Sequence, residues 1–172
     1  MPFEALADLL ARSLIYILPA YFANGAPVVF GGGRPLDGGR TFRDGRPIFG
    51  PRKTVRGFIS GVLVGALTGL ALGLVGLVPS LPDALVLGFL MGLGAMLGDL
   101  AGSFVKRRLN RPPGAPAPLL DQLDFVVGAV LLVLPFRPPA LDELACVLVL
   151  TPLIHLATNF AAYKLGLKKE PW

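Results

Sequence analysis

Five apolar segments of about 20 residues constrain this chain more than any other feature of its sequence. They cover residues 3–22, 55–78, 82–104, 119–136 and 141–165. A helix needs about 20 mostly apolar residues to cross the hydrocarbon core of a bilayer. Within lipid, the backbone polar groups of a single segment are all satisfied only in a helix. The sequence therefore predicts one all-α, polytopic domain over residues 1–172 with five transmembrane helices.

The composition excludes a soluble globular domain. Hydrophobic residues make up 53% of the chain and charged residues only 16%, whereas soluble domains carry about 25% charged residues. The net charge of +5 would indicate a nucleic-acid partner in a soluble protein. In a membrane protein it reflects basic loops that face anionic headgroups and polyphosphates. We therefore expect a lipid bilayer, and no nucleic acid, as a partner.

The basic residues are concentrated in two long connections and the C-terminal tail. The connections after the second and fourth segments are short, whereas those at about residues 23–54 and 105–118 are long and basic. Lys and Arg mark cytoplasmic loops. With five spans, both long loops and the C-terminus lie in the cytoplasm and the N-terminus lies outside. The cations are Arg34, Arg40, Arg43, Arg46, Arg52 and Lys53 in the first loop, and Lys106, Arg107, Arg108 and Arg111 in the second.

Glycines recur at a spacing of four in the second segment, from Gly57 to Gly73, and in the third segment at Gly94, Gly98 and Gly102. This spacing places small residues on one helix face, where a neighbouring backbone can approach closely. The pattern predicts a compact helix bundle and carries no information about chemistry.

Acidic residues stand at the cytoplasmic ends of the third and fourth segments. Asp99, Ser103 and Lys106 share one helix face, and so do Asp121 and Asp124. A carboxylate inside a membrane costs about 2.5–3.5 kcal/mol at the centre of a span, so such residues are usually functional. Because the two helix ends are joined by one Pro-rich loop, the three carboxylates can meet at one depth.

Three carboxylates beside a cluster of Lys and Arg suggest a divalent metal next to a polyphosphate. Mg²⁺ prefers oxygen ligands and is usually held by one or two carboxylates together with phosphate oxygens. The alternative is that Asp121 and Asp124 only stabilise the N-terminus of the fourth helix, and that Lys106 to Arg108 only obey the positive-inside rule. The residues alone leave both interpretations open.

Two further pairs of polar residues lie before or within apolar segments. Lys53 and Thr54 precede the second segment, where a helix N-terminus can bind an anion. The alternative for that first loop is a flexible basic segment that contacts headgroups. His155 and Asn159 lie one turn apart in the fifth segment, and we interpret His155 as a packing residue.

Four motifs in order along the chain resemble CDP-archaeol synthase, the archaeal CTP-dependent cytidylyltransferase of ether lipids. The resemblance covers essentially the whole chain. Residues 99–124 are also similar to the signature of bacterial phosphatidate cytidylyltransferases, but the chain lacks their Pro-Gly-His-Gly-Gly stretch, and Gln122 replaces a usual basic residue. The motifs are Asn24-Gly25-Ala26-Pro27, the loop from Asp37 to Thr54, Gly98-Asp99-Leu100 with Ser103 to Arg108, and Asp121-Gln122-Leu123-Asp124-Phe125.

The resemblance implies a Mg²⁺-dependent enzyme whose active site faces the cytoplasm. The phosphate of an unsaturated archaeol phosphate, 2,3-bis-O-geranylgeranylglycerol 1-phosphate, would attack the α-phosphorus of CTP and give CDP-archaeol and pyrophosphate. The resemblance implies four catalytic residues, Asp99, Lys106, Asp121 and Asp124, of which the three aspartates hold the metal. It implies Lys106 and Arg107 as binding residues for the triphosphate, and Asn24, Lys53 and Thr54 as binding residues for nucleotide or lipid phosphate.

A small cation channel or transporter with intramembrane Asp sites is the alternative function. A transport path needs polar groups throughout the depth of the membrane. The candidate site instead gathers at one face, and the second and third segments contain almost no polar residues.

Overall fold

Each predicted apolar segment forms one helix in the computed structural model, which describes residues 2–170. The prediction of an all-α protein is confirmed for this part of the chain. The helices are α1 (Pro2–Phe30), α2 (Val55–Leu74), α3 (Leu81–Arg108), α4 (Leu120–Val133) and α5 (Leu141–Lys164).

Four of the helices, α1, α2, α3 and α5, are long and apolar enough to cross a membrane. α4 has 14 residues and is therefore about 21 Å long, less than the roughly 30 Å of a hydrocarbon core. Proline explains both of its ends. Pro118 precedes Leu119, which adopts a positive φ of 65°, and Pro135 follows Val133 by two residues.

The first helix is longer than predicted. α1 continues to Phe30, so Asn24 to Pro27 lie in the helix, and the first long connection begins at Gly31 instead of residue 23. In water the Asn-Gly-Ala-Pro sequence would favour a turn. Here α1 packs along α2, and a methyl group on Gly57 would touch the Cβ of Pro27. Packing among apolar helices thus outweighs the local turn preference.

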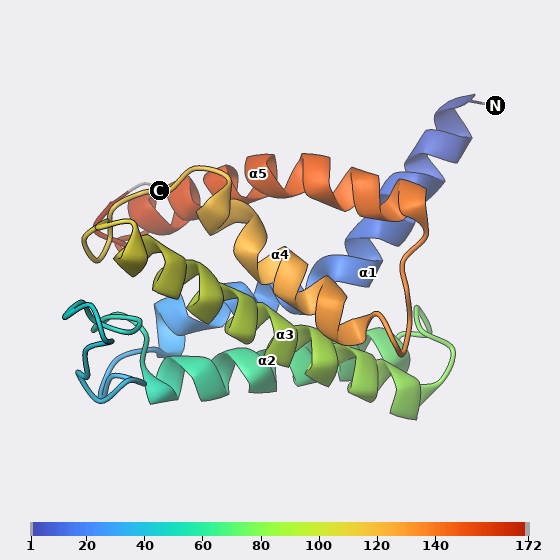
Figure 1. Cartoon of the computed structure of the whole chain (residues 1–172). Coiled ribbons are helices and arrows are strands. Elements are labelled where there is room, and N and C mark those ends of the chain that lie inside the picture. Colours follow the sequence, from blue (N-terminus) through green and yellow to red (C-terminus); the bar gives the residue numbers. More distant parts are fainter. Residues whose placement is uncertain (1, 171–172) are drawn as a thin grey trace.

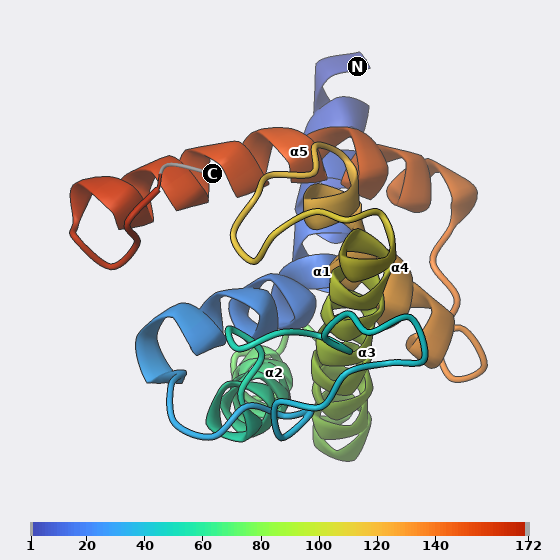
Figure 2. The same cartoon turned by 60° about the vertical axis from the view of Figure 1, so that its left-hand side comes forward.

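The helices alternate in direction, so the chain connections gather at the two ends of the bundle. α1 and α5 begin at one end, and the long connections and residues 165–170 lie at the other (Figure 1). Figure 2 shows that α1 bends midway. Pro19 lies inside this helix and removes a backbone hydrogen bond, which explains the bend.

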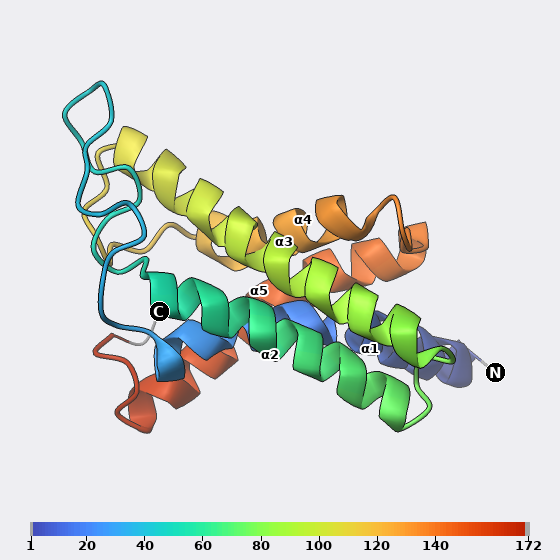
Figure 3. The same ribbon diagram turned by 90° about the horizontal axis from the view of Figure 1, so that it is seen from below.

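The glycine stripe of α2 packs directly on α3. A methyl group on Gly65 would overlap the backbone of Gly92, and one on Gly69 would overlap the backbone of Gly88. Figure 3 shows the two helices side by side along their length. Glycine is therefore required at these positions, because the two backbones lie too close for any side chain.

A second glycine stripe on α3 packs on α4. A methyl group on Gly94 would overlap the backbone of Gly128, and one on Gly98 would overlap the carbonyl group of Asp124. At Gly102 the neighbouring group is the carboxylate of Asp124. This stripe brings the acidic residues of α3 and α4 to the same end of the bundle.

α5 packs on both α1 and α4, and more on α1. Arg12 Nη1 lies 3.0 Å from Glu143 Oε1, and the hydroxyl groups of Tyr21 and Thr151 are hydrogen bonded at 2.8 Å. Both contacts fall in the N-terminal half of α5. Pro152 follows inside the helix, and beyond it α5 diverges from the bundle (Figure 2).

We predict that Gly65→Ala destabilises the bundle. The added methyl group meets the Gly92 backbone, which cannot move without displacing α3, and overpacking of this kind costs about 1–3 kcal/mol. The melting temperature in detergent should therefore fall. Gly25→Ala is the matched control, because a methyl group there meets nothing within 4 Å; equal melting temperatures for both variants would contradict the packing.

Candidate functional site

Asp37 organises the first long connection, residues 31–54. Its carboxylate accepts hydrogen bonds from the N–H groups of Gly39 (2.9 Å), Phe49 (3.0 Å) and Gly50 (3.0 Å). Burial alone raises the pKa of the Asp37 carboxyl, but the N–H groups of Gly50, Phe49 and Gly39 together outweigh burial and hold that pKa below its ordinary value. These hydrogen bonds give the loop a defined conformation, so it is not merely a flexible basic segment.

The same loop is fixed to the C-terminal end of α3. Arg108 Nε lies 3.0 Å from Asp44 Oδ2, and its guanidinium packs on the rings of Phe42 and Phe104. Arg46 donates to the backbone carbonyl of Arg108, one of the carbonyl groups that a helix end leaves unpaired. These contacts fold the loop over the end of the bundle.

A polar cavity of about 350 Å³ opens at this end. Its wall combines both long connections, residues 165–170 and the ends of four helices. The face predicted on α3 is confirmed, because Asp99, Ser103 and Lys106 all line the cavity. The cationic lining residues outnumber the acidic ones: they are Arg52, Lys53, Lys106, Arg107 and Lys168, against Asp99, Asp121 and Glu170.

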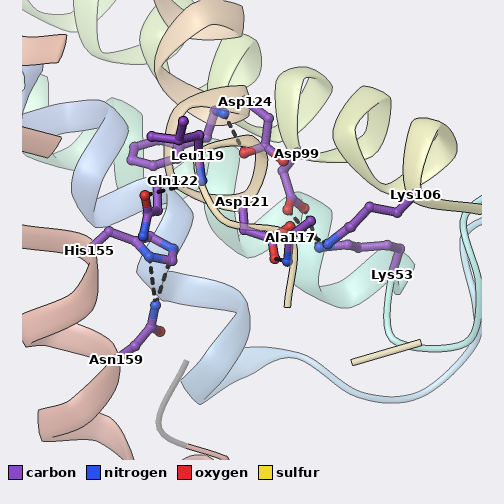
Figure 4. A network of polar contacts seen from close by, with 11 residues as sticks. Lys53, Asp99, Lys106, Ala117, Leu119, Asp121, Gln122, Asp124, His155 and Asn159 are labelled. Carbon is purple, nitrogen blue, oxygen red and sulfur yellow. Dashed lines mark hydrogen bonds and ion pairs between the residues drawn. The ribbon is translucent and has the colours of Figure 1, made fainter. Parts of the chain in front are cut away.

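Two lysine–aspartate pairs occupy the cavity wall. Lys53 Nζ lies 2.6 Å and 2.7 Å from the two carboxylate oxygens of Asp99. Lys106 Nζ donates to Asp121 Oδ1, while Asp121 Oδ2 accepts the N–H of Ala117 at 2.8 Å. Figure 4 shows both lysines reaching into the site from the same side. Asp121 therefore does two things: it supports the turn before α4 and presents a charged oxygen to the cavity.

Arg107 is the most deeply buried cation in this wall, with only 5% of its surface exposed. Its Nε and Nη1 atoms are buried and make no hydrogen bond to any residue that the structure describes. A buried guanidinium without partners is costly. The side chain also lines the cavity, so its guanidinium is suited to an anion that enters there.

Asp124 occupies a different position from the other two aspartates. Its carboxylate packs against Gly102, accepts the N–H of Phe125 at 2.7 Å, and lines a second, apolar cavity between α3 and α4. Gly102 lies one turn beyond Asp99 on α3. The three carboxylates thus come from adjoining turns of two packed helices, but only Asp99 and Asp121 line the polar cavity.

No three His, Cys, Asp or Glu side chains within residues 2–170 gather closely enough to hold a metal ion by themselves. Asp99 and Asp121 nevertheless offer the hard oxygen ligands that suit Mg²⁺. Both are paired with lysine ammonium groups, which occupy the place that a cation would take beside them. Mg²⁺ commonly completes its coordination with phosphate oxygens and water, so two protein carboxylates are a sufficient anchor.

The two remaining predicted site residues, Asn24 and Thr54, both lie in or next to a helix. Asn24 lies in α1, not in a loop, and it still lines the polar cavity. Thr54 is buried, and its hydroxyl accepts the N–H of Gly57 at 3.1 Å. This hydrogen bond makes Thr54 the N-cap of α2, so its hydroxyl positions the helix and the adjacent Lys53.

Sequence reasoning assigned no part in the site to four residues that line the cavity. Arg52 lines it and lies 3.4 Å from Glu170. His155 and Asn159 of α5 also line it, and Lys168 donates to Asn159 Oδ1 at 2.8 Å. The i, i+4 spacing of His155 and Asn159 was the available signal, but only the fold shows that α5 reaches the site.

Comparison with known proteins finds similarity over most of the chain. The sequence profile of the family described as CarS-like, CDP-archaeol synthase, matches residues 6–172. The CDP-archaeol synthase of Pyrococcus furiosus is 52% identical over 158 residues, 91% of this chain and 95% of the relative. That of Methanopyrus kandleri is 52% identical over 166 residues, 95% of this chain and 94% of the relative.

A solved structure shows the same fold. It is of an intramembrane enzyme for archaeal membrane lipid biosynthesis and matches with a TM-score of 0.78 at 39% identity, over 87% of this chain and 94% of that chain. These similarities give no support to a cation channel or transporter.

We predict that Asp37→Asn loosens the first long connection. Hydrogen bonds to a charged acceptor contribute about 1.5–3 kcal/mol, so amide hydrogen exchange over residues 31–54 should accelerate about tenfold or more at neutral pH. Asp83→Asn, at the opposite end of the bundle, is the control.

The pH dependence of this effect has a definite sign. The folded-state pKa of Asp37 is lowered from 3.8, so its contribution is complete above the unfolded-state pKa and is lost as pH falls through the folded-state pKa. The difference between the wild type and Asp37→Asn should therefore shrink in acid. If amide hydrogens of residues 31–54 in Asp37→Asn exchange at the wild-type rate at neutral pH, the role of Asp37 is contradicted.

Proposed function

This chain belongs to the CDP-archaeol synthase family of archaeal membrane-lipid biosynthesis, and we propose that it transfers a cytidylyl group from CTP to an unsaturated archaeol phosphate in the polar cavity. The products are CDP-archaeol and pyrophosphate. The acceptor is 2,3-bis-O-geranylgeranylglycerol 1-phosphate, an ether lipid with a single phosphate group.

The buried guanidinium of Arg107, in which Nε and Nη1 make no hydrogen bond to any described residue, is the observation that carries this proposal. A polyphosphate supplies the several anionic oxygens that its fixed donors require. Lys53 and Lys106 stand beside it in the same wall. The cavity is therefore suited to the triphosphate of a nucleotide, which brings more negative charge than a carboxylate or a single phosphate group.

Asp99 of α3 and Asp121 of α4 are the proposed Mg²⁺ ligands on the cavity side. Asp124, which follows Asp121 by three residues on α4, is the proposed third ligand. When bound, Mg²⁺ neutralises phosphate charge and orients the triphosphate. The ammonium groups of Lys53 and Lys106 are then released from the aspartates and bind phosphate oxygens. This exchange of partners explains why the site holds equal numbers of lysines and aspartates in close pairs.

The chemistry requires positioning and charge stabilisation more than proton transfer. An oxygen of the acceptor phosphate forms a new bond to the α-phosphorus of CTP, and the bond from that phosphorus to the bridging oxygen breaks and releases pyrophosphate. The attacking phosphate is already ionised at pH 7, so a strong general base is unnecessary. Arg107 and Lys106 stabilise the charge that builds up on the transferred group and the leaving pyrophosphate.

The site is proposed to face the cytoplasm, which holds CTP. Both long basic connections and residues 165–170 lie at the end of the bundle that carries the cavity (Figure 1). Lys and Arg accumulate on cytoplasmic loops. α1 begins at the opposite end, so the same proposal puts its N-terminus on the outer side of the membrane.

We predict that purified protein supplied with labelled CTP, Mg²⁺ and the lipid phosphate releases pyrophosphate, and that it does so faster with the ether acceptor than with a diacyl ester acceptor. Absence of release with every acceptor would overturn the proposed reaction.

Arg107→Gln should weaken CTP binding about 10- to 100-fold, because a charged hydrogen-bond donor is lost. Arg111→Gln, an exposed change in the adjacent loop, should leave CTP binding within about twofold.

Asp124→Asn tests the third carboxylate. The amide keeps the size of the side chain beside Gly102 but removes the negative charge, so we expect turnover to be lost while the melting temperature stays near that of the wild type. Asp83→Asn is the control at the opposite end of the bundle. Turnover near the wild-type rate in Asp124→Asn would remove this residue from the site.

A further inference from the structure

An apolar cavity of about 520 Å³ lies between the C-terminal halves of α1 and α5. Side chains such as Leu18, Phe22, Val29 and Ile154 line it. It exists because α5 is tied to α1 only near its N-terminal half and diverges beyond Thr151. The volume falls in the range of ligand-binding cavities, about 300–1,000 Å³.

This apolar cavity adjoins the polar one. Asn24, Val28, His155, Asn159 and Leu167 line both. An apolar space that leads directly into a cationic, polar space matches an amphipathic ligand with a hydrocarbon chain and an anionic head.

Polar side chains of α5 and the C-terminal tail mark the junction. The amide nitrogen of Asn159 lies 3.0 Å from a ring nitrogen of His155, and the amide oxygen accepts from Lys168 Nζ at 2.8 Å. The His155 ring stacks on Phe125, with the ring centroids 6.4 Å apart, beside Asp124. Figure 4 shows His155 and Asn159 on the opposite side of the site from Lys53 and Lys106.

We propose that the acceptor lipid binds across this junction, with one isoprenoid chain between α1 and α5 and its phosphate at Asn159 and Lys168. This inference rests on the proposed function and deepens it. Asn159 and Lys168 become acceptor-binding residues, and His155 becomes a positioning residue that holds Asn159. They are separate from the Arg107 side of the cavity, which holds the nucleotide. The two substrates then approach from opposite walls, as direct transfer between them requires.

The cavity between α3 and α4 is the competing location for the chain. It is also apolar, at about 620 Å³, but it shares no lining residue with the polar cavity. Its single charged lining residue is Asp124, an acid, which would repel a lipid phosphate. The charge pattern therefore favours the α1–α5 cavity.

A pair of adjacent alanines tests the location of the chain. Ala162 lines the α1–α5 cavity, whereas Ala161 lines none of the three cavities described above and is exposed on α5. In steady-state assays at saturating CTP, Ala162→Phe should raise the KM for the lipid acceptor at least about tenfold. Ala161→Phe should leave it within about twofold, and the Kd for CTP should be unchanged in both. Equal acceptor KM values for the two variants would overturn the inference.

Asn159→Ala tests the head-group contact. Loss of its hydrogen bonds should raise the KM for the acceptor about tenfold without weakening CTP binding. A merely structural role would lower kcat or the melting temperature and leave the acceptor KM unchanged, which would contradict the assignment.

A binding experiment separates this inference from the proposed reaction. A dialkylglycerol phosphate with a diazirine in one chain would be bound to wild-type protein without CTP, irradiated, and the labelled peptides identified by mass spectrometry. Labels on α1 and α5 that unlabelled lipid phosphate displaces support the inference even if no turnover is found. Labels on α3 and α4, or labels that a phosphate-free dialkylglycerol displaces equally well, overturn it.

Discussion

The close approach of α3 and α4 is the contact on which the site depends. Gly94, Gly98 and Gly102 allow the backbone and the Asp124 side chain of α4 to lie directly against α3. In lipid, helix association relies on such packing, because apolar surface gains little by leaving an apolar solvent. The same contact places carboxylates of both helices near one end of the bundle, where water and loops can reach them and where their charge is tolerated.

Charge balance at that end links the helices to the loops. Asp99 and Asp121 lie in a partly buried wall, and Lys53 and Lys106 pair with them at close range. Lys53 belongs to the connection that Asp37 organises and that Arg108 fixes to α3. A loop, a helix end and an acidic cluster therefore form one electrostatic unit. Arg107 Nε and Nη1 make no hydrogen bond to any described residue, so the unit is suited to an additional polyanion.

Much of this arrangement follows from sequence patterns. Hydrophobic length predicted five helices, and helical spacing predicted that Asp99, Ser103 and Lys106 share a face. The placement of Lys53 before α2 was also predicted. These features depend on local periodicity, which a sequence records directly.

Other features depend on packing between distant segments. The local sequence does not indicate that Pro27 stays helical where it packs against Gly57. It also does not indicate that the Thr54 hydroxyl caps the N-terminus of α2. Asp124 shares a helix face with Asp121, yet it lines a different cavity, because the contact with Gly102 directs it toward α3. Only the fold shows that Arg107 is buried. It also shows that three residues distant from α3 in sequence line the same site, namely His155, Asn159 and Lys168.

The central claim is that a nucleotide triphosphate and Mg²⁺ replace the lysine–aspartate pairs of the polar cavity. An experimental structure of the protein with a non-reactive CTP analogue and Mg²⁺ tests it most directly. The account predicts phosphate oxygens on Arg107, Lys53 and Lys106, and an ion on Asp99 and Asp121. A nucleotide bound elsewhere, or bound while Lys53 still contacts Asp99 and Lys106 still contacts Asp121, would contradict it.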